Sequence, residues 1–424
     1  MRMCRQWGPG DASASRRKYP AVFAAARGSH LVDEDGRRYL DFLCGAGAVN
    51  YGHNPPPIRE RLIAHLMGEG LVQALDLHTV EKRRFLERFE EEVLAPRGLP
   101  HRVQFTGPTG ANAVEAALKV ARKATGRSTI AAFTGGYHGM SLGALAATGN
   151  AMKRRGAGVP LGDVVRLPFD GYFGEGIDTA ALAREMILDP SSGVDAPAAF
   201  LVEPIQGEGG VNVASAPWLR AITALAREVG ALLIVDDIQS GCGRSGRFFG
   251  FDGLDVTPDV ICLSKSLSGY GLPMSVILVA PEVDVWKPGE HNGTFRGSTP
   301  AFVTAAAALD YWADPTFLAR VSANVAALDA RLPAIAAALA PGACRVKGRG
   351  LLRGLAFADP ADAEAVSREA FADGLVVETC GARGEVVKIM PQIDADAAVL
   401  EEGLAILERA ASRATGASGR RRAA

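Results

Sequence analysis

The feature that most constrains the fold is a series of short apolar runs separated by amphipathic stretches between residues 103 and 279. Runs without a polar residue at every second position are typical of strands buried on both faces of a parallel sheet. The alternation of such runs with helical patterns predicts an α/β fold with a mainly parallel sheet covered by helices on both faces. The predicted strands are Val103–Phe105, Thr129–Phe133, Val164–Leu167, Ala198–Pro204, Ala231–Asp236, Val260–Leu263 and Ser275–Val279. The predicted helices among them are Ala111–Ala124, Thr179–Leu188 and Trp218–Val229.

A different pattern begins near residue 312. A long Ala- and Leu-rich helix is predicted at Leu318–Leu339, followed by a helix at Ala361–Ala372 and by the strand sequences LVVET and VVKIM. This mixture predicts a second, smaller α+β domain. We divide the chain into a loose N-terminal segment (1–18), a segment that contributes to the small domain (19–75), a large cofactor-binding domain (76–311), the small domain (312–413) and a flexible tail (414–424).

Composition excludes several classes of function. Hydrophobic residues make up 48% of the chain and the formal net charge is -1, so a chain-wide basic field for nucleic acid is absent. The six cysteines form no CxxC pair, and we expect neither a disulfide framework nor a metal site. No apolar run reaches the ~18 residues of a membrane span, and the N-terminus lacks the apolar core of a secretory signal. We expect a cytoplasmic enzyme that acts on small molecules.

Two charged residues end predicted strands, at the edge where open parallel sheets bind ligands. Asp236 ends the run ALLIVD, where a partly desolvated carboxylate requires a cationic group opposite it. A helix cap or a structural ion pair is the alternative. Lys265 ends DVICLSK before the glycine-rich loop SGYGLP. A lysine shielded from water has a lowered pKa and can form a Schiff base with an aldehyde. An ordinary surface lysine is the alternative.

Two turns add groups suited to the same ligand. The turn TGPTG at 106–110 leads into a helix, and glycines and hydroxyl groups at a helix N-terminus bind anions through backbone N–H groups. The turn GGYHG at 135–139 follows a strand, so that Tyr137 could stack on a flat cofactor beside His138. The alternatives are an ordinary helix cap, a core tyrosine and a hydrogen-bonded buried histidine.

These four groups together meet the requirements of pyridoxal 5'-phosphate. The cofactor needs a lysine for its aldehyde, a carboxylate for its pyridine nitrogen, a helix end for its phosphate and a flat face against its ring. A competing motif, GCGRSG at 241–246, matches the GxGxxG of dinucleotide-binding proteins. Residues 236–240 separate it from the strand and no helix is predicted after it, so we exclude nucleotide binding there.

From about Tyr39 to Gln392 the sequence resembles the class III, fold-type I pyridoxal-phosphate aminotransferases. The resemblance implies a seven-stranded, mainly parallel sheet flanked by helices, with a smaller α+β domain. It also implies a homodimer or higher homo-oligomer with the active site at the subunit interface. The stretches that carry it are LDFLCGAGAVNYGHNPP, FTGPTGANAVEAALKVAR, GGYHGMSLGALAATG, LVEPIQGEGGV, LLIVDDIQSGCGRSGRFFGF, PDVICLSKSLSGYGLPM and HNGTFRGS.

The same resemblance implies a role for each matching residue. Lys265 would form the Schiff base and shuttle the substrate proton, and Asp236 would pair with the pyridine nitrogen. Gln239 would approach the ring's 3-hydroxyl group. The other implied cofactor contacts are Thr109, Gly110, Ala111 and the neighbouring subunit's Thr294 at the phosphate, Tyr137 and His138 at the ring, and Glu203 as a second carboxylate.

Three further residues are implied in substrate binding. Glu208 matches a glutamate that helps ornithine- and 4-aminobutyrate-type enzymes to switch between two substrates. Lys388 stands where many relatives have an arginine that binds the amino-acid carboxylate. Because lysine cannot make the paired hydrogen bonds of a guanidinium group, Lys388 and Arg296 are both candidates for that role.

The sequence looks most like the diaminobutyrate–2-oxoglutarate aminotransferases, including those of ectoine biosynthesis. This likeness implies transfer of the amino group of L-glutamate to aspartate 4-semialdehyde, giving L-2,4-diaminobutyrate and 2-oxoglutarate by a reversible, ping-pong reaction. One alternative is a class III enzyme for another diamino or ω-amino acid of secondary metabolism. The others are an aminomutase, racemase or decarboxylase on the same scaffold, and a non-catalytic binding protein, against which the presence of Lys265 and Asp236 argues.

Overall fold

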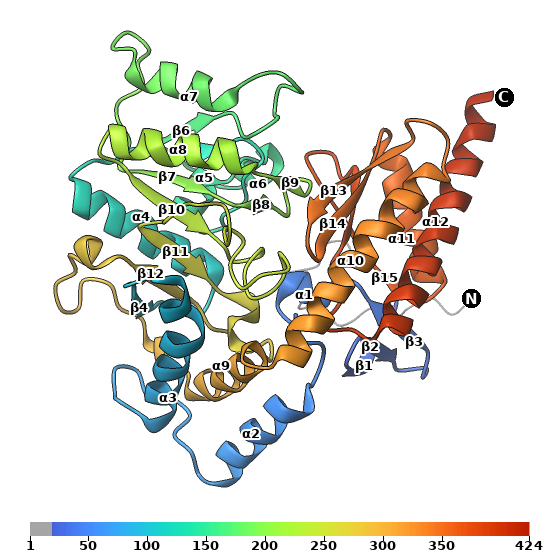
Figure 1. Ribbon diagram of the computed structural model, residues 1–424, viewed down its shortest axis with the longest axis horizontal. Helices are drawn as coiled ribbons and strands as arrows, with labels where there is room; N and C mark the ends of the chain where they lie inside the picture. The colour runs from blue at the N-terminus through green and yellow to red at the C-terminus, as the bar shows by residue number, and fades with distance from the viewer. Residues whose placement is uncertain (1–18, 424) are drawn as a thin grey trace.

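The computed structural model describes residues 19–423, and its largest element is a seven-stranded sheet (Figure 1). All its strands run in parallel except β12, which is antiparallel to both of its neighbours. The predicted mainly parallel sheet and all seven of its strands are therefore confirmed. In spatial order the strands are β4 (Arg102–Phe105), β12 (Val276–Val279), β11 (Val260–Leu263), β10 (Leu232–Asp236), β7 (Ala199–Val202), β5 (Ile130–Phe133) and β6 (Val164–Leu167).

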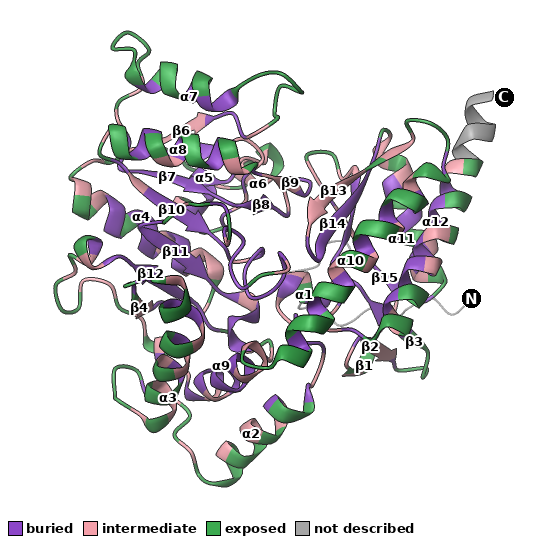
Figure 2. Ribbon diagram, in the orientation of Figure 1, coloured by how far each residue is buried: buried purple, intermediate pink, exposed green. Residues whose placement is uncertain are grey.

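The strands of the large sheet are mostly buried (Figure 2). Apolar side chains pack on both of its faces, which explains why the strands read as continuous apolar runs. Ile234 of β10 belongs to a core cluster with helix α4 (Gly110–Thr125) and helix α5 (Leu142–Ala147). Its neighbour Val235 belongs to a second cluster. The helices of that second cluster are α3 (Val80–Phe89), α7 (Thr179–Leu188), α8 (Ala216–Glu228) and α9 (Thr299–Trp312).

Two four-stranded sheets lie beside this core, on the right of Figure 1. One consists of β1 (Phe23–Arg27), β2 (His30–Asp33), β3 (Arg38–Asp41) and β15 (Leu375–Val376), in that order. The other consists of β13 (Cys344–Arg349), β14 (Leu352–Phe357), β17 (Val386–Ile389) and β16 (Glu378–Cys380), also in order. Helices α10 (Pro315–Ala337), α11 (Pro360–Ala372) and α12 (Ala397–Ala423) contribute to one hydrophobic core with these strands. The domain limits proposed above stay a prediction.

The other elements are short and lie mostly between the strands of the large sheet or before it. The hairpin strands β8 and β9 flank the loop that carries Glu208. These elements are α1 (Cys44–Gly47), α2 (Pro56–Met67), η1 (Glu90–Leu94), η2 (Ala95–Arg97), α6 (Ala151–Arg155), β8 (Ile205–Gln206), β9 (Asn212–Val213), η3 (Lys265–Ser268), η4 (Pro281–Val283) and η5 (Thr294–Gly297).

The two ends of the chain differ in how they compare with the sequence prediction. Segment 1–18 lies outside the described residues. Helix α12 continues to Ala423, so the backbone at 414–423 is helical, while the flexibility expected of 414–424 stays a prediction. Alanine and arginine are abundant there, and both favour a helix. Within residues 19–423, none of the helices combines the length and the hydropathy of a membrane span.

The topology places the predicted chemical groups at one edge of the large sheet. Asp236 is the last residue of β10, and Lys265 opens the short helix η3 two residues after β11. Helix α4 begins at Gly110, a few residues after β4. Since β4, β10 and β11 run in the same direction, their carboxyl ends lie at the same edge. The candidate site is therefore produced by strand direction.

Candidate active site

A cavity of about 290 Å³ lies at this edge of the sheet, near the lower end of the size range of small-molecule sites. It brings together most of the predicted site residues from five separate parts of the chain. It is lined by Gly110, Ala111, Tyr137, His138, Gly139, Met140, Glu203, Glu208, Asp236, Ile238, Gln239 and Lys265.

The carboxylate of Asp236 is buried and held in a fixed orientation. Its Oδ2 lies 2.8 Å from Nδ1 of His138, whose side chain is buried as well. Its Oδ1 accepts a hydrogen bond of 3.2 Å from the backbone N–H of Ile238. The sequence predicted that His138 would lie near the ring but did not predict this contact. His138 is placed to fix the direction in which Asp236 faces the cavity.

Lys265 enters the cavity from a strained backbone position. Its φ of 51° is in the left-handed region, which is uncommon for residues other than glycine. The next residue anchors it, because Ser266 Oγ donates to the carbonyl of Gly47 and accepts from the N–H of Asn50, both at 2.8 Å. Burial lowers the pKa of Lys265 to about 8, with a further contribution from the positive charge of Lys388. A larger fraction of Lys265 is thus uncharged and nucleophilic at neutral pH than for an exposed lysine.

The N-terminus of helix α4 forms one wall of the cavity. Thr109 caps this helix, with Oγ1 accepting from the N–H of Asn112 at 3.3 Å. The N–H groups of the first turn have no carbonyl partner within the helix, so those of Gly110 and Ala111 are suited to an anion. A Cβ atom on Gly139 would lie 2.7 Å from Cβ of Ala111, so only glycine permits this close approach. Thr109 itself does not border the cavity.

Tyr137 and Glu203 form a second wall. The backbone N–H of Tyr137 donates to Oε2 of Glu203 at 2.9 Å. Burial and the negative charge of Asp236 raise the pKa of Glu203 well above its ordinary value. The ammonium group of Lys153 lies 4.0 Å from the centre of the Tyr137 ring. Tyr137 and Glu208 also border a larger cleft of about 950 Å³, so these two residues separate the cavity from that cleft.

Lys388 lies behind Glu208 and does not border the cavity. Its ammonium group forms ion pairs with Glu208 and with Glu378, the latter at 2.7 Å. Burial alone would raise the pKa of Glu208, but the adjacent Lys388 outweighs it and lowers that pKa to about 2. Sequence reasoning missed Glu378, although its place opposite Lys388 follows from pairing the strand sequences LVVET and VVKIM as antiparallel neighbours.

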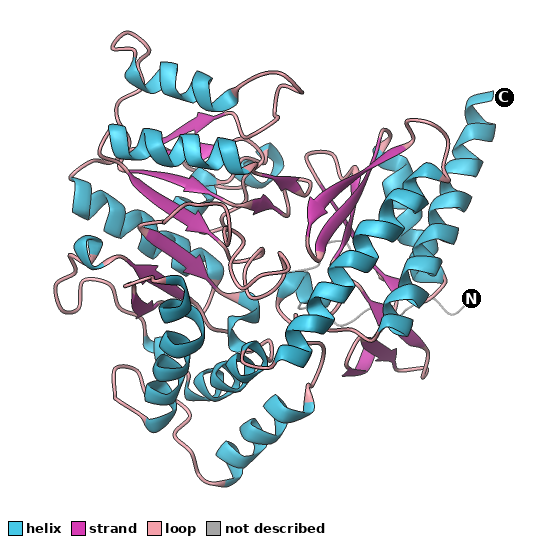
Figure 3. Cartoon of the chain, in the orientation of Figure 1, coloured by secondary structure: helices cyan, strands magenta, loops and turns pink. Residues whose placement is uncertain are grey.

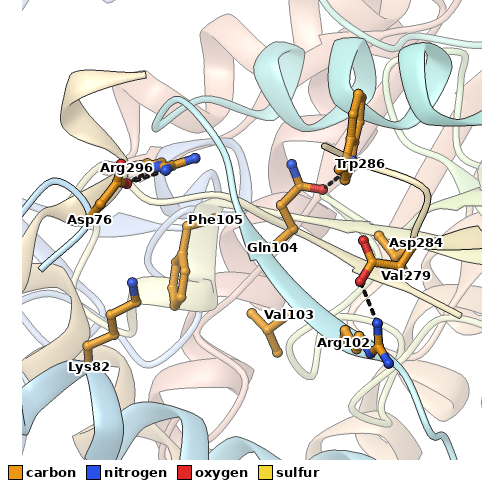
Figure 4. A pocket seen from close by; sticks show the side chains of 10 residues that line it. All are labelled: Asp76, Lys82, Arg102, Val103, Gln104, Phe105, Val279, Asp284, Trp286 and Arg296. Carbon is orange, nitrogen blue, oxygen red and sulfur yellow. Dashed lines mark hydrogen bonds and ion pairs between the residues drawn. The ribbon is translucent and has the colours of Figure 1, made fainter. Parts of the chain in front are cut away.

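The structure does not bring Arg296 or Thr294 into the cavity of the same chain. Arg296 is ion-paired with Asp76 beside a different cavity, which Lys82, Phe105 and Trp286 also line (Figure 4). Thr294 begins the short helix η5, and its carbonyl accepts a hydrogen bond of 2.9 Å from Gln73. Their roles stay predictions, and for Thr294 the predicted role belongs to a neighbouring subunit.

The donor set of the cavity fits pyridoxal phosphate. Lys265 supplies an amine for the aldehyde, Asp236 a carboxylate for the pyridine nitrogen, and the first turn of α4 N–H groups for the phosphate. Among the described residues, Oε1 of Gln239 is buried without a hydrogen-bond partner, as expected beside a ligand hydroxyl group. The fold and this donor set define the class of α/β enzymes that hold pyridoxal phosphate through a lysine.

Comparisons with known proteins agree with this class. The sequence profile of the family described as aminotransferase class-III matches residues 12–411. The chain is 51% identical over 394 residues to the diaminobutyrate–2-oxoglutarate transaminase of Bordetella parapertussis, covering 92% of this chain and 91% of that protein. It is 52% identical over 394 residues to the Streptomyces anulatus transaminase of the same name, covering 93% of each.

A solved structure shows the same fold. It is an ornithine aminotransferase from Toxoplasma gondii with partial occupancy of pyridoxal phosphate at its active site. The TM-score is 0.82 at 27% identity, covering 98% of this chain and 92% of that one. The chain belongs to the class-III aminotransferase family and is a transaminase, and this family implies pyridoxal phosphate as its cofactor.

Proposed function

We propose that the protein transfers the amino group of L-glutamate to the aldehyde of aspartate 4-semialdehyde, giving L-2,4-diaminobutyrate and 2-oxoglutarate. The observation that carries the proposal is the cavity that joins Lys265, the Asp236–His138 pair and the N-terminus of α4. The choice of substrates is supported by the identity of about one half to transaminases named for this reaction, over more than nine-tenths of the chain.

Bound pyridoxal phosphate supplies an aldehyde that carries the amino group and a ring that withdraws electrons from the reacting carbon. In this proposal Lys265 binds the cofactor and moves the proton at the carbon that bears the amino group. Asp236, oriented by His138, keeps a proton on the ring nitrogen. Gly110 and Ala111, with Thr109 and the neighbouring subunit's Thr294, hold the phosphate.

The other lining residues position the ring and the substrate. Tyr137 packs against the ring face and Gln239 approaches its hydroxyl group. Glu203 holds the backbone of Tyr137 in place through the hydrogen bond described above. Glu208 faces the substrate, and Lys388 binds a substrate carboxylate only when Glu208 has moved, because Glu208 lies between Lys388 and the cavity.

We further propose a homodimer with the active site at the subunit interface, located in the cytoplasm, whose product serves ectoine biosynthesis. Support for the interface comes from exposed apolar side chains on the segment that hydrogen-bonds to Thr294, including Leu71, Val72, Leu77 and Val80. Met140 lines the cavity and is 52% exposed, which leaves one side of the cavity open for a second chain to complete. Each described cysteine is unpaired, which agrees with a reducing compartment.

A half-reaction screen tests the proposed substrates. Purified protein loaded with pyridoxal phosphate would be mixed separately with L-glutamate, L-2,4-diaminobutyrate, L-ornithine and 4-aminobutyrate, while the visible absorbance of the cofactor is followed. We expect glutamate and diaminobutyrate to discharge the absorbance at least about tenfold faster than the other two. Faster reaction with ornithine or 4-aminobutyrate would assign a different acceptor, and turnover without consumption of a 2-oxo acid would indicate a mutase or racemase.

A further inference from the structure

Lys388 carries a buried positive charge between two carboxylates that come from different elements. Its side chain has no exposed surface, whereas the side chains of Glu208 and Glu378 are each 26% exposed. Burial would lower the pKa of Lys388, but the two carboxylates reverse this effect and raise it above the ordinary value. Lys388 is therefore charged throughout the working pH range, and its charge depends on both partners.

Glu208, the partner of Lys388 that borders the cavity, can move only by rotation of its side chain. The carbonyl of Glu208 accepts a hydrogen bond of 3.0 Å from the N–H of Gly381, which fixes the backbone. A Cβ atom on Gly209 would lie 2.2 Å from the carbonyl oxygen of Gly135, so the loop is packed tightly on that side as well. Glu208 borders both the 290 Å³ cavity and the 950 Å³ cleft, and its carboxylate has room to rotate between them.

The other partner is fixed by the sheet. Glu378 of β16 lies directly opposite Lys388 of β17 in the antiparallel register, and its Oε1 is 2.7 Å from Nζ of Lys388. Side chains directly opposite each other in adjacent strands are held within contact distance by the backbone. Glu378 borders neither the cavity nor the cleft. Rotation of Glu208 thus leaves Lys388 with one carboxylate still in place.

The two proposed amine substrates make different demands on this arrangement. Glutamate has a carboxylate on the carbon that carries the reacting amine, and that carboxylate reaches Lys388 only when Glu208 has left. Diaminobutyrate reacts at its terminal amine, where the carbon carries two hydrogens and no carboxylate, and Glu208 can stay paired. A buried charge that loses its only partner is strongly destabilised. Glutamate requires its own carboxylate to replace Glu208 on Lys388. The rate of this exchange therefore depends on whether Lys388 keeps a second carboxylate partner.

We propose that Glu378 is a positioning residue that keeps Lys388 paired while Glu208 rotates away, and thereby sets the rate at which the site accepts donors with a carboxylate on the reacting carbon. This inference rests on the proposed function, and it adds a residue that touches neither substrate nor cofactor. It also assigns different tasks to the two carboxylates, since Glu208 exchanges with the substrate and Glu378 does not.

The test compares two half-reactions of the cofactor-loaded protein and of its Glu378→Gln variant in a stopped-flow instrument. We expect the variant to react with L-glutamate at least about tenfold more slowly, because Lys388 loses its standing partner during the exchange. Its reaction with L-2,4-diaminobutyrate is expected to stay within about twofold of the wild type, since no exchange takes place. Glu378→Asp retains the charge and should recover most of the glutamate rate. Glu364→Gln, on the exposed face of α11, is the control for a lost surface carboxylate.

A binding measurement supplies a readout that does not depend on turnover. 2-Oxoglutarate would be added to the cofactor-loaded protein, and the change in visible absorbance would be followed. The protein cannot convert 2-oxoglutarate without an amino donor. We expect Glu378→Gln to slow association about tenfold while the Kd changes by less than about threefold, because one carboxylate replaces another on Lys388 in either protein. Thermal unfolding of the variant confirms that it is folded.

Each outcome of these measurements either supports or overturns the proposed role of Glu378. Equal slowing with both amines, or a Kd that weakens in step with the association rate, would show a merely structural role and overturn the proposal, as would unchanged kinetics. A wild-type protein that reacts with glutamate but not with diaminobutyrate corrects the proposed acceptor, and the comparison is then made with the primary amine that does react. A wild type inert to glutamate overturns the proposed function, and the association of 2-oxoglutarate still decides the role of Glu378.

Discussion

Two lysines, the partly buried Lys265 at the edge of the large sheet and the fully buried Lys388 in the small sheet, have opposite electrostatic environments. For Lys265 burial outweighs the attraction of Glu208, Asp236 and Glu203, and the pKa is lowered to about 8. Burial also acts to lower the pKa of Lys388, but direct contact with two carboxylates outweighs this effect and raises the pKa. The comparison shows that burial alone does not make a lysine reactive. The distance of the nearest carboxylates decides between a nucleophile and a permanent cation.

The different environments of Lys265 and Lys388 correspond to their different positions in the fold. Lys265 follows a strand and stands in a left-handed backbone conformation at the cavity, where its side chain is accessible to an aldehyde. Lys388 lies within strand β17, where the register places a carboxylate directly opposite it. The charged groups at the strand ends therefore border the cavity, whereas Lys388 is a fixed charge within the small sheet.

The largest effect is expected from removing the reactive lysine. Lys265→Ala should lower the rate of amino transfer at least about 1,000-fold, since both the attachment point of the cofactor and the proton carrier are lost. Borohydride reduction of the loaded wild type, followed by peptide mapping, should place the cofactor on Lys265. Attachment to Lys388 would reverse the comparison between the two lysines, and attachment to Lys287 or Lys347 would show that Lys265 is not the reactive lysine. Reduced Lys265→Ala protein, which should carry no label, is the control.

The sequence predicted the charged groups at the cavity far better than the contacts between residues distant in the chain. Asp236 and Lys265 each end an apolar run, and an apolar run followed by a charged residue is visible in a single stretch of sequence. The contact between His138 and Asp236 joins residues 98 positions apart, and the pair of Glu208 with Lys388 joins residues 180 apart. Such contacts depend on how loops pack in three dimensions, and no local pattern contains that information.

The outcomes of three other predictions also have physical causes in particular residues. The strand prediction succeeded because parallel strands are buried on both faces and therefore read as continuous apolar runs. Arg296 was a candidate for the substrate carboxylate, yet in this chain Asp76 is its partner, on a segment more than 200 residues earlier. Residues 414–424 were interpreted as a flexible tail, and the backbone of α12 continues through them to Ala423, where alanines and arginines favour a helix.

Replacing Lys265 or Lys388 by methionine, which is similar in length but uncharged, should change the free energy of unfolding by different amounts. Lys388→Met leaves Glu208 and Glu378 without their shared partner, so the free energy of unfolding should fall by about 3 kcal/mol. Lys265→Met removes a charge that burial already disfavours, so the free energy of unfolding should rise or stay within about 1 kcal/mol. Urea unfolding of both variants without cofactor measures the difference. Equal losses of stability would show that Lys265 and Lys388 do not have opposite electrostatic environments.

The smallest effect concerns the pH at which Lys265 becomes reactive. A lysine whose pKa is lowered to about 8 is charged below that pH and uncharged above it. The rate at which cofactor-free protein attaches pyridoxal phosphate covalently should therefore rise about tenfold per pH unit below pH 8 and level off above it, because only the uncharged amine attacks the aldehyde. An ordinary lysine would continue to gain rate up to its pKa of about 10.4. Since Lys388 contributes to the lowered pKa, Lys388→Met should shift the midpoint upward. A rate that still increases at pH 10 in the wild type would mean that Lys265 is not desolvated, and the contrast with Lys388 would then have to rest on contact with carboxylates alone.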